Sequence, residues 1–502
     1  MRKQGAVSLS LYSWVLSLLL LLTTCAVAQQ QQSAPPGNPA TSQSAAPEQK
    51  ISKADAKALF QSVDEILQFA SKDTGLPIKH SVKRKLASRE EVSKYIQDRM
   101  KDDEDSKRLQ RSEVVLKKFG LIPEQFDLRS FLADLLKEQV AGFYDTKKKT
   151  VFLLDWVEPE AQRPVLAHEL THALQDQNFN LDKWTKAAMA PRKSEKHRDL
   201  ASDLMEDERL AAQEAVAEGQ ATVVLIDYML APYGQSAKAN PQIADAVMAG
   251  MATTGQTPLY TKAPMFLKQL LLFPYQRGGK FETDVLARAG TEAAFAGTFR
   301  RPPANSRQIL HPSTYLEHEV IPPMRVPDFT GAAGKEYSVY DMSVMGEFDV
   351  WLLAKQYSGQ KSADSLGPMW RGGYYYAGLK PGTAKTSKGS VEVPTTAIAL
   401  AYASRWASAD AAEQFAAVYA NALSKHYKSV REVGATNRQV PEIGATVMAG
   451  IADRLKGTRT WYTEQGPLSI ETRGDTMLVM EGFDQAAAGR IRDAVFSPKL
   501  NQ

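Results

Sequence analysis

Hydrophobic residues recur at helical spacing through much of the first 300 residues. Over residues 54–70, for example, Leu59 and Val63 belong to one apolar helical face. Ser88 and Glu91 have the spacing of a capping box, in which each side chain caps the other's backbone and opens a helix. The same periodicity predicts further helices over residues 105–119, 128–139, 206–230 and 265–273.

Strand-like runs predict sheet structure at both ends of this helical body. Residues 142–145 and 150–155 flank three lysines and read as a hairpin. Beyond about residue 325 the patterns intermix, with a helix over 342–357, strand character over 391–403, a helix over 408–426 that Ser408 caps, a hairpin from 461–470 and 476–481, and a terminal helix over 485–496. These patterns predict a helix-rich α+β fold.

The chain divides into five regions by composition and pattern. Residues 1–28 resemble a signal peptide, and residues 29–50 are a low-complexity linker of Gln, Ser, Ala and Pro. We expect an N-terminal helical region over 51–128, a core that carries the chemistry over 129–325, and a C-terminal α+β region over 326–502.

The first 28 residues predict export. Basic residues at positions 2 and 3 precede an apolar run over 11–22, and small residues lead to a cleavage site after Ala28. An alternative is a lipoprotein anchored through Cys25, because the residues before it loosely resemble a lipobox. Thr24 is bulkier than the residue usual before a lipidated cysteine, which favours cleavage after Ala28. Either route predicts a periplasmic, secreted or envelope-anchored protein.

Charge and hydropathy limit the partners. The formal net charge is +4, and it falls to +2 without residues 1–28, which contain two basic residues and no acidic residue. Such near-neutrality argues against a dedicated nucleic-acid binder. No later run is long and apolar enough to predict a transmembrane helix. The oligomeric state stays open.

One segment carries specific chemistry: His168-Glu169-Leu170-Thr171-His172. On a helix, residues i and i+4 project from one face, so His168 and His172 can bind one metal ion while Glu169 faces a water molecule on it. Pro164 suits the first turn of that helix, and apolar residues between positions 167 and 174 give it a buried face. The alternative is a chance motif of surface or packing histidines.

A catalytic zinc ion needs a third protein ligand and an open fourth position. The pattern that supplies a third histidine six residues further on is excluded, because this chain has Gln175 and Asn178 in place of the required glycine and histidine. We therefore expect a carboxylate. Glu218 is the first choice because its small neighbours, Gly219 among them, let its helix approach the first closely. Two other carboxylates are alternatives for the third ligand. They are Glu214, which could instead be a hydrogen-bond partner of a ligand, and Asp227.

These residues resemble a known group of enzymes. His168-Glu169-x-x-His172 followed by Glu218-Gly219-x-Ala221 is similar to the gluzincin metallopeptidases, and the Glu-Gly-x-Ala part looks like their aminopeptidase N-like branch. The chain also resembles a family of largely uncharacterised bacterial exported proteins. Four segments carry this resemblance: residues 141–145, 168–177, 308–312 and 481–484. The resemblance implies a zincin-like catalytic core with a small sheet beside the metal helix. The Gly-x-Met-Glu-Asn strand that serves exopeptidases of that branch is missing before His168.

The mechanism implied is metal-assisted amide hydrolysis, in which Glu169 takes a proton from the attacking water and passes it to the leaving amine. His311, Tyr315 and Tyr275 are candidate donors to the oxyanion, because they lie in or near proline-marked segments. His311 can equally be a core or capping residue. The strand before the metal helix could line the cleft and pair with an extended substrate.

The leading hypothesis is therefore an exported metallopeptidase that binds one Zn²⁺ ion and acts on a peptide or protein substrate. A first alternative is a non-catalytic envelope binding or assembly protein on the same scaffold, since a fold does not fix a function. A second is a zinc hydrolase of cell-wall amides. Glu169 favours an enzyme, because a structural zinc site needs no general base.

Overall fold

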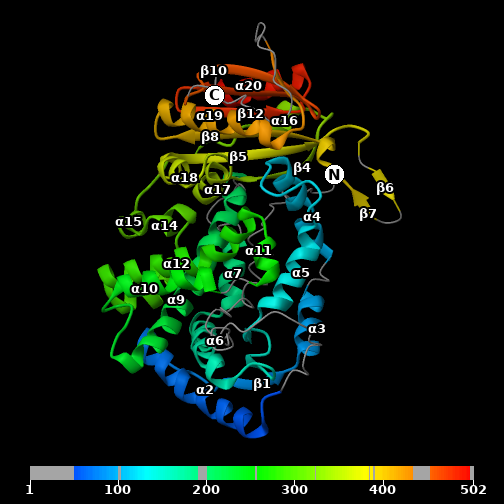
Figure 1. The fold of residues 1–502 in the computed structure, drawn as a ribbon. Helices are drawn as coiled ribbons and strands as arrows, with labels where there is room; N and C mark the ends of the chain where they lie inside the picture. The colour runs from blue at the N-terminus through cyan, green and yellow to red at the C-terminus, as the bar shows by residue number, and fades with distance from the viewer. Residues whose placement is uncertain are drawn as a thin grey trace, which may run out of the picture.

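The computed structural model describes residues 50–99, 103–189, 200–254, 257–322, 324–383, 385–387, 390–433 and 453–497. The expected signal peptide, Cys25 and the linker up to residue 49 lie outside them. Figure 1 shows a helix-rich body with a large sheet at one end, and the helix nearest the N-terminus at the other. The described residues therefore form an α+β fold, as the sequence predicts.

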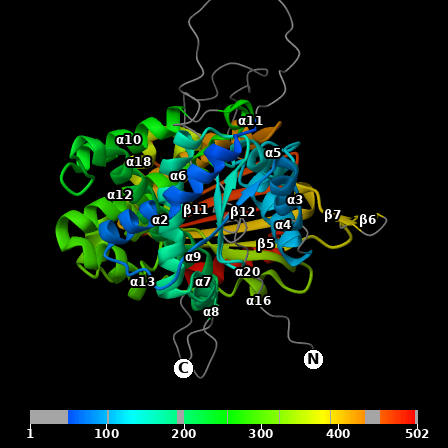
Figure 2. The ribbon, with the colours of Figure 1, turned by 90° about the horizontal axis from the view of Figure 1, so that it is seen from below.

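The N-terminal region contains four helices. They are α2 (Lys53–Thr74), α3 (Arg89–Arg99), α4 (Asp103–Lys118) and α5 (Leu128–Gln139). The capping box at α3 is confirmed, since Glu91 N donates to Ser88 Oγ at 3.3 Å and Ser88 N donates to Glu91 Oε2 at 3.0 Å. Helix α2 packs along α6 (Pro159–Phe179), the helix of the histidine motif (Figure 2).

A three-stranded sheet lies beside α6. The predicted hairpin is confirmed: β2 (Phe143–Asp145) pairs with β3 (Thr150–Leu154) in antiparallel register. The sequence analysis missed β1 (Lys83–Ala87), which pairs with β3 in parallel, so that β3 is the central strand and β1 and β2 are the edges. The small sheet next to the motif helix is therefore present.

Long helices form the centre of the molecule. They are α6, α9 (Glu206–Leu230) and α12 (Met265–Glu292), with α7 (Leu181–Met189), α8 (Leu200–Leu204), η1 (Ala231–Tyr233), α10 (Pro241–Thr254) and α11 (Pro258–Lys262) around them. Two expected boundaries were wrong. Helix α6 begins at Pro159, so Pro164 lies inside it, where its missing N–H leaves only one carbonyl without a helical donor. Helix α12 continues through Pro274 because its flanking residues are buried against α9.

Short elements connect α12 to the C-terminal region. A π-helical turn, η2 (Ala293–Gly297), is followed by α13 (Thr298–Arg300), α14 (Ser306–Leu310) and α15 (Pro312–Leu316). The proline-marked segment that contains His311 is thus partly helical. None of the helices in the described ranges combines the length and the apolar composition that a membrane crossing needs.

The large sheet is antiparallel and has the order β4-β5-β8-β12-β11-β10-β9. Its strands are β4 (Ser338–Val344), β5 (Trp370–Leu379), β8 (Ile398–Trp406), β9 (Val430–Glu432), β10 (Gly457–Thr463), β11 (Gly466–Arg473) and β12 (Thr476–Glu481). A separate ribbon pairs β6 (Lys385–Ser387) with β7 (Ser390–Glu392). The helix expected over 342–357 was wrong in its first part, where the chain is still in β4; α17 (Glu347–Ser358) begins after Gly346.

Helices cover both faces of this sheet. One face packs against α17 and α19 (Ala409–His426), and the other against α16 (Phe329–Ala333) and α20 (Gln485–Phe496). The remaining short helices are α18 (Gln360–Leu366), η3 (Gly367–Met369) and η4 (Thr395–Ala397). The predicted cap of α19 is confirmed, because Ala411 N donates to Ser408 Oγ at 3.2 Å. One hydrophobic core runs from α2 through α6, α9 and α12 to this sheet.

Candidate metal centre

Two adjacent helices bring three metal-ligating side chains together. His168 and His172 lie one turn apart on α6, and Glu218 lies in the middle of α9, which packs against α6. The His168 Nε2 atom lies 3.0 Å from Glu218 Oε2 and 3.1 Å from His172 Nε2, and the third side of this triangle is 3.5 Å. His168, His172 and Glu218 are called the trio below.

The trio fits a small divalent cation. Its ligand atoms converge within 4.8 Å of one another, and all three side chains are buried. Ligand atoms about 2.0–2.1 Å from a tetrahedral zinc ion lie about 3.3 Å apart, close to the separations in the trio. Two imidazole nitrogens and one carboxylate oxygen are also a donor set that zinc accepts. The trio can therefore hold a metal ion, as the sequence predicts.

The trio also compensates its own charge. Burial raises the pKa of Glu218, but the two histidines outweigh this effect and lower the pKa to about 2. Burial lowers the pKa of His172, whereas Glu218, and then Glu169, raise it to about 9. At His168 burial dominates and lowers the pKa. Without an ion, the trio is thus a buried His172–Glu218 ion pair beside a neutral imidazole, and a cation would replace the proton of His172.

Glu169 is held by an edge strand of the small sheet. The backbone N–H of Tyr144 in β2 donates to Glu169 Oε2 at 2.8 Å. The Tyr144 hydroxyl donates to Asp176 Oδ2 at 2.8 Å, and so the same residue contacts α6 at two points seven residues apart. Strand β2 is an edge strand of its sheet and lies next to α6.

The close helix approach at Gly219 is real, but its expected partner was wrong. A Cβ atom on Gly219 would lie 2.3 Å from the backbone carbon of Gly278, and one on Gly278 would lie 2.1 Å from the carbonyl oxygen of Ala215. These glycines join α9 to α12, not to α6. Larger side chains fit between α6 and α9 because the metal ligands themselves occupy that interface.

This glycine contact brings Tyr275 to the trio. Tyr275 precedes Gly278 by one helical turn, hydrogen-bonds to Glu218, and has its ring centroid 6.1 Å from that of His168. Burial, and then Glu218, raises the pKa of its phenol well above the ordinary value. Among the three donors named from the sequence, Tyr275 is the one that the structure brings to the trio.

Glu214 lies one turn before Glu218 on the same helix and outside the trio. Its Oε1 atom is buried and has no hydrogen-bond partner among the described residues. Burial, and then the charge of Glu218, raises its pKa well above the ordinary value. Glu214 therefore lies next to the ligands but not among them, and Glu218 is the ligand that the geometry favours.

The other competitor, Asp227, lies nine residues beyond Glu218, about 13 Å along the helix axis. It hydrogen-bonds to Asp73 of α2 and accepts the backbone N–H of Ala237. Burial raises the pKa of Asp227 to about 6. Burial, and then the charge of Asp227, raises the pKa of Asp73 to about 7. Asp227 thus belongs to a carboxyl pair that joins α2 to α9.

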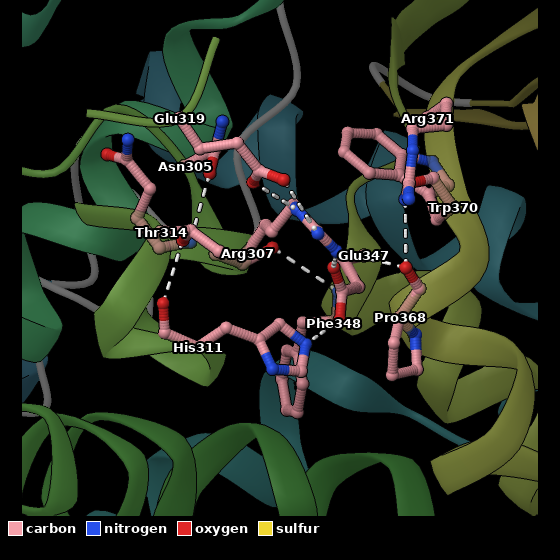
Figure 3. A network of polar contacts seen from close by, with 12 residues as sticks. Asn305, Arg307, His311, Thr314, Glu319, Glu347, Phe348, Pro368, Trp370 and Arg371 are labelled. Atoms are coloured by element: carbon pink, nitrogen blue, oxygen red, sulfur yellow. Dashed lines mark hydrogen bonds and ion pairs between the residues drawn. The ribbon is translucent and has the colours of Figure 1, made fainter. Parts of the chain in front are cut away.

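His311 lies in a different cluster (Figure 3), and Tyr315 contacts Arg301. His311 Nε2 lies 2.6 Å from Glu347 Oε1, and Arg307 Nη1 donates to Glu347 Oε2 at 2.8 Å. Arg307 also contacts Glu319, with Nε 2.9 Å from its Oε2. The Tyr315 hydroxyl donates to the carbonyl of Arg301 at 2.8 Å. The structure therefore does not bring His311 or Tyr315 to the trio.

The sequence reading missed two glutamines at the metal centre. Gln175 Oε1 lies 2.9 Å from His172 Nδ1, and Gln175 Nε2 donates to Gln220 Oε1 at 3.1 Å. Their positions carry a weak signal, since one lies three residues after His172 and the other two residues after Glu218. Nothing in the sequence says that the two amides meet.

Comparisons with family models, curated proteins and solved structures found no match for this chain. The functional interpretation therefore rests on the motif residues and on the geometry described above.

Proposed function

We propose that this protein is an exported, zinc-dependent metallopeptidase of gluzincin type that hydrolyses peptide bonds. His168, His172 and Glu218 would hold the ion, and Glu169 would act as the general base. The observation that carries this proposal is the convergence of three ligand atoms from two helices, with a further carboxylate, held by Tyr144, on one of those helices. A purely structural metal site needs no such carboxylate.

A bound zinc ion supplies Lewis acidity, which activates water and polarises the substrate carbonyl. Glu169 is assigned the transfer of the proton from water to the leaving amine. The Tyr144 N–H fixes one of its oxygens, so the carboxylate keeps its orientation in both steps. Tyr275, whose raised pKa keeps its proton in place, is the assigned donor to the developing oxyanion.

Access to the site requires motion. The side chains of His172 and Glu218 are 0% and 2% exposed, and Glu169 is 1% exposed as a whole residue. A peptide can therefore reach Glu169 only when neighbouring elements separate. The same burial lowers the local dielectric constant and strengthens each electrostatic contact once the site has closed.

The test uses the chain from residue 29 onward and its Glu169→Gln variant. Metal analysis should find about one zinc ion per chain in both proteins, because glutamine still offers an oxygen to the Tyr144 N–H. Cleavage of a peptide library should fall by about 10²–10⁴-fold in the variant. Unchanged cleavage in the variant would remove Glu169 from the mechanism.

The same preparation distinguishes the two other functions. Zinc binding without cleavage of any peptide or cell-wall amide would favour a binding or assembly protein. Cleavage of muropeptide amides alone would redirect the proposal to cell-wall hydrolysis. A parent protein that binds no zinc would refute the metal centre itself.

A further inference from the structure

Two amide side chains, those of Gln175 and Gln220, form a series of hydrogen bonds that begins at His172. Gln175 Oε1 lies 2.9 Å from His172 Nδ1, and Gln175 Nε2 donates to Gln220 Oε1 at 3.1 Å and to the carbonyl of Ala217 at 3.0 Å. Gln220 Nε2 lies within 3.1 Å of three acceptors at the π-helical turn η2: the carbonyls of Ala294 and Phe295, and Thr298 Oγ1. Both glutamines are completely buried.

The backbone carbonyls at η2 fix the direction of every hydrogen bond in this series of side chains. Backbone carbonyls only accept, so those of Ala294 and Phe295 fix the Gln220 amide with its NH₂ group toward η2 and its oxygen toward Gln175. That oxygen needs a donor, and the carbonyl of Ala217 needs one too, so Gln175 must present its NH₂ group to both. Its own oxygen then faces His172.

An oxygen at that place demands a proton on His172 Nδ1. As a metal ligand His172 is neutral and keeps only the proton on Nδ1, so its lone pair lies on Nε2, the atom that faces His168 and Glu218. We propose that Gln175 and Gln220 form a relay that fixes this tautomer of His172 and thereby positions it as a metal ligand. The inference rests on the metal centre of the proposed function, and both glutamines are positioning residues.

The relay differs from a carboxylate partner in its charge. A carboxylate beside a ligating imidazole adds a negative charge to the site, whereas the two amides are neutral. With Gln175 and Gln220 as partners, the charge of the ligand set comes from Glu218 alone. The relay also anchors the ligand to an irregular turn of backbone, and π-helical turns recur at functional sites.

The first test needs no substitution. The zinc-loaded protein, labelled with ¹⁵N-histidine, should show for His172 a protonated Nδ1 and a metal-bound Nε2 in long-range ¹H–¹⁵N correlation spectra. The Nδ1 proton should exchange slowly because Gln175 is buried. Zinc bound through Nδ1, or a His172 ring proton that exchanges at the rate of exposed imidazoles, would overturn the proposal.

The second test compares three variants by zinc competition with a chromogenic chelator. Gln175→Leu removes the acceptor at His172, and the zinc dissociation constant should rise by about 10–100-fold. Gln220→Leu should raise it by less than tenfold, because the Ala217 carbonyl still orients Gln175. Thr171→Val is the control: its hydroxyl is buried on the same helix but donates to Ala167 O, so zinc affinity should not change.

The outcomes separate this inference from the proposed function. A parent that binds zinc while Gln175→Leu binds it equally well would overturn the relay and leave the metallopeptidase proposal intact. A parent without zinc would refute both. Should Gln175→Leu fail to fold, the spectra of the parent still decide the matter.

Discussion

In the described part of the chain, two clusters that join histidine to a buried glutamate differ in what lies between the side chains. In the cluster of Figure 3, both oxygens of Glu347 are used, one by His311 and the other by Arg307. In the trio, the ligand atoms of His168, His172 and Glu218 face one another at 3.0–3.5 Å. The first arrangement is already neutralised by a fixed cation, whereas the second can exchange its proton for a metal ion.

Residue type and burial alone therefore do not identify a metal site. Glu347 is 1% exposed and Glu218 is 1% exposed, and each contacts a histidine. The guanidinium of Arg307 occupies the place at Glu347 that a cation would need. This difference predicts opposite responses of the two clusters to substitution.

The largest effect is expected from Glu218→Ala. Loss of one of three ligands should remove about a third of a metal-binding free energy of about 10–16 kcal/mol, which corresponds to a zinc dissociation constant about 10³-fold higher. Peptide cleavage should disappear at ordinary zinc concentrations. Glu347→Ala is the matched control, and its zinc content should equal that of the parent. Equal zinc loss in both variants would show that the clusters do not differ as described.

The next effect concerns stability. Arg307→Met leaves Glu347 without its buried cation, and breaking such a pair costs about 3–5 kcal/mol of unfolding free energy. Denaturant unfolding measures this loss, and zinc affinity should stay within twofold of the parent. If the variant instead lost zinc and kept its stability, the Arg307 cluster would have to act on the metal centre.

A third prediction compares Tyr275 with His311 as the oxyanion donor. Tyr275→Phe should lower kcat by about 10²-fold, the cost of removing one such donor, with little change in KM. His311→Gln should leave kcat within twofold, because its imidazole contacts Glu347 and not the trio. A larger loss of kcat in His311→Gln than in Tyr275→Phe would reverse the assignment.

Local signals in the sequence predicted most of the long helices described in this fold. The bounds of α5 and α20 agree with the expected residues because an amphipathic face and its caps are properties of neighbouring residues. Strand β5 was missed because nearly all of its residues are buried, which removes the alternation that marks a strand. Pro274 was taken as a helix end, although tertiary packing carries α12 through it.

The same distinction holds for the candidate site. The spacing of His168 and His172 is a local signal, and Glu218 follows from the need for a carboxylate between small residues. The contact of Tyr275 with Glu218 depends on the meeting of Gly219 and Gly278, which are far apart in the sequence. The amide relay likewise needs α6, α9 and η2 together, so only the fold could reveal it.

The carboxyl pair of Asp73 and Asp227 extends the comparison, because here two carboxyl groups lie against each other and their pKa values are raised. Burial, and then Asp227, raises the pKa of Asp73 from its ordinary value near 4 to about 7. Between these values the folded protein holds a proton that the unfolded chain releases, so stability is complete below about pH 4 and falls as the pH rises toward 7.

The smallest expected effect tests this pair. Asp73→Asn cannot ionise and still donates to Asp227, so its unfolding free energy relative to the parent should rise by about 1–2 kcal/mol between pH 4.5 and pH 7.5. Denaturant unfolding at the two pH values measures the change, and Glu65→Gln, at an exposed position of the same helix, is the control. A relative stability that does not change with pH would mean that a fixed cation, and not a shared proton, balances this pair. The pair would then belong with the Arg307 cluster, and the trio would be the only one of the three clusters whose charge is balanced by an exchangeable proton.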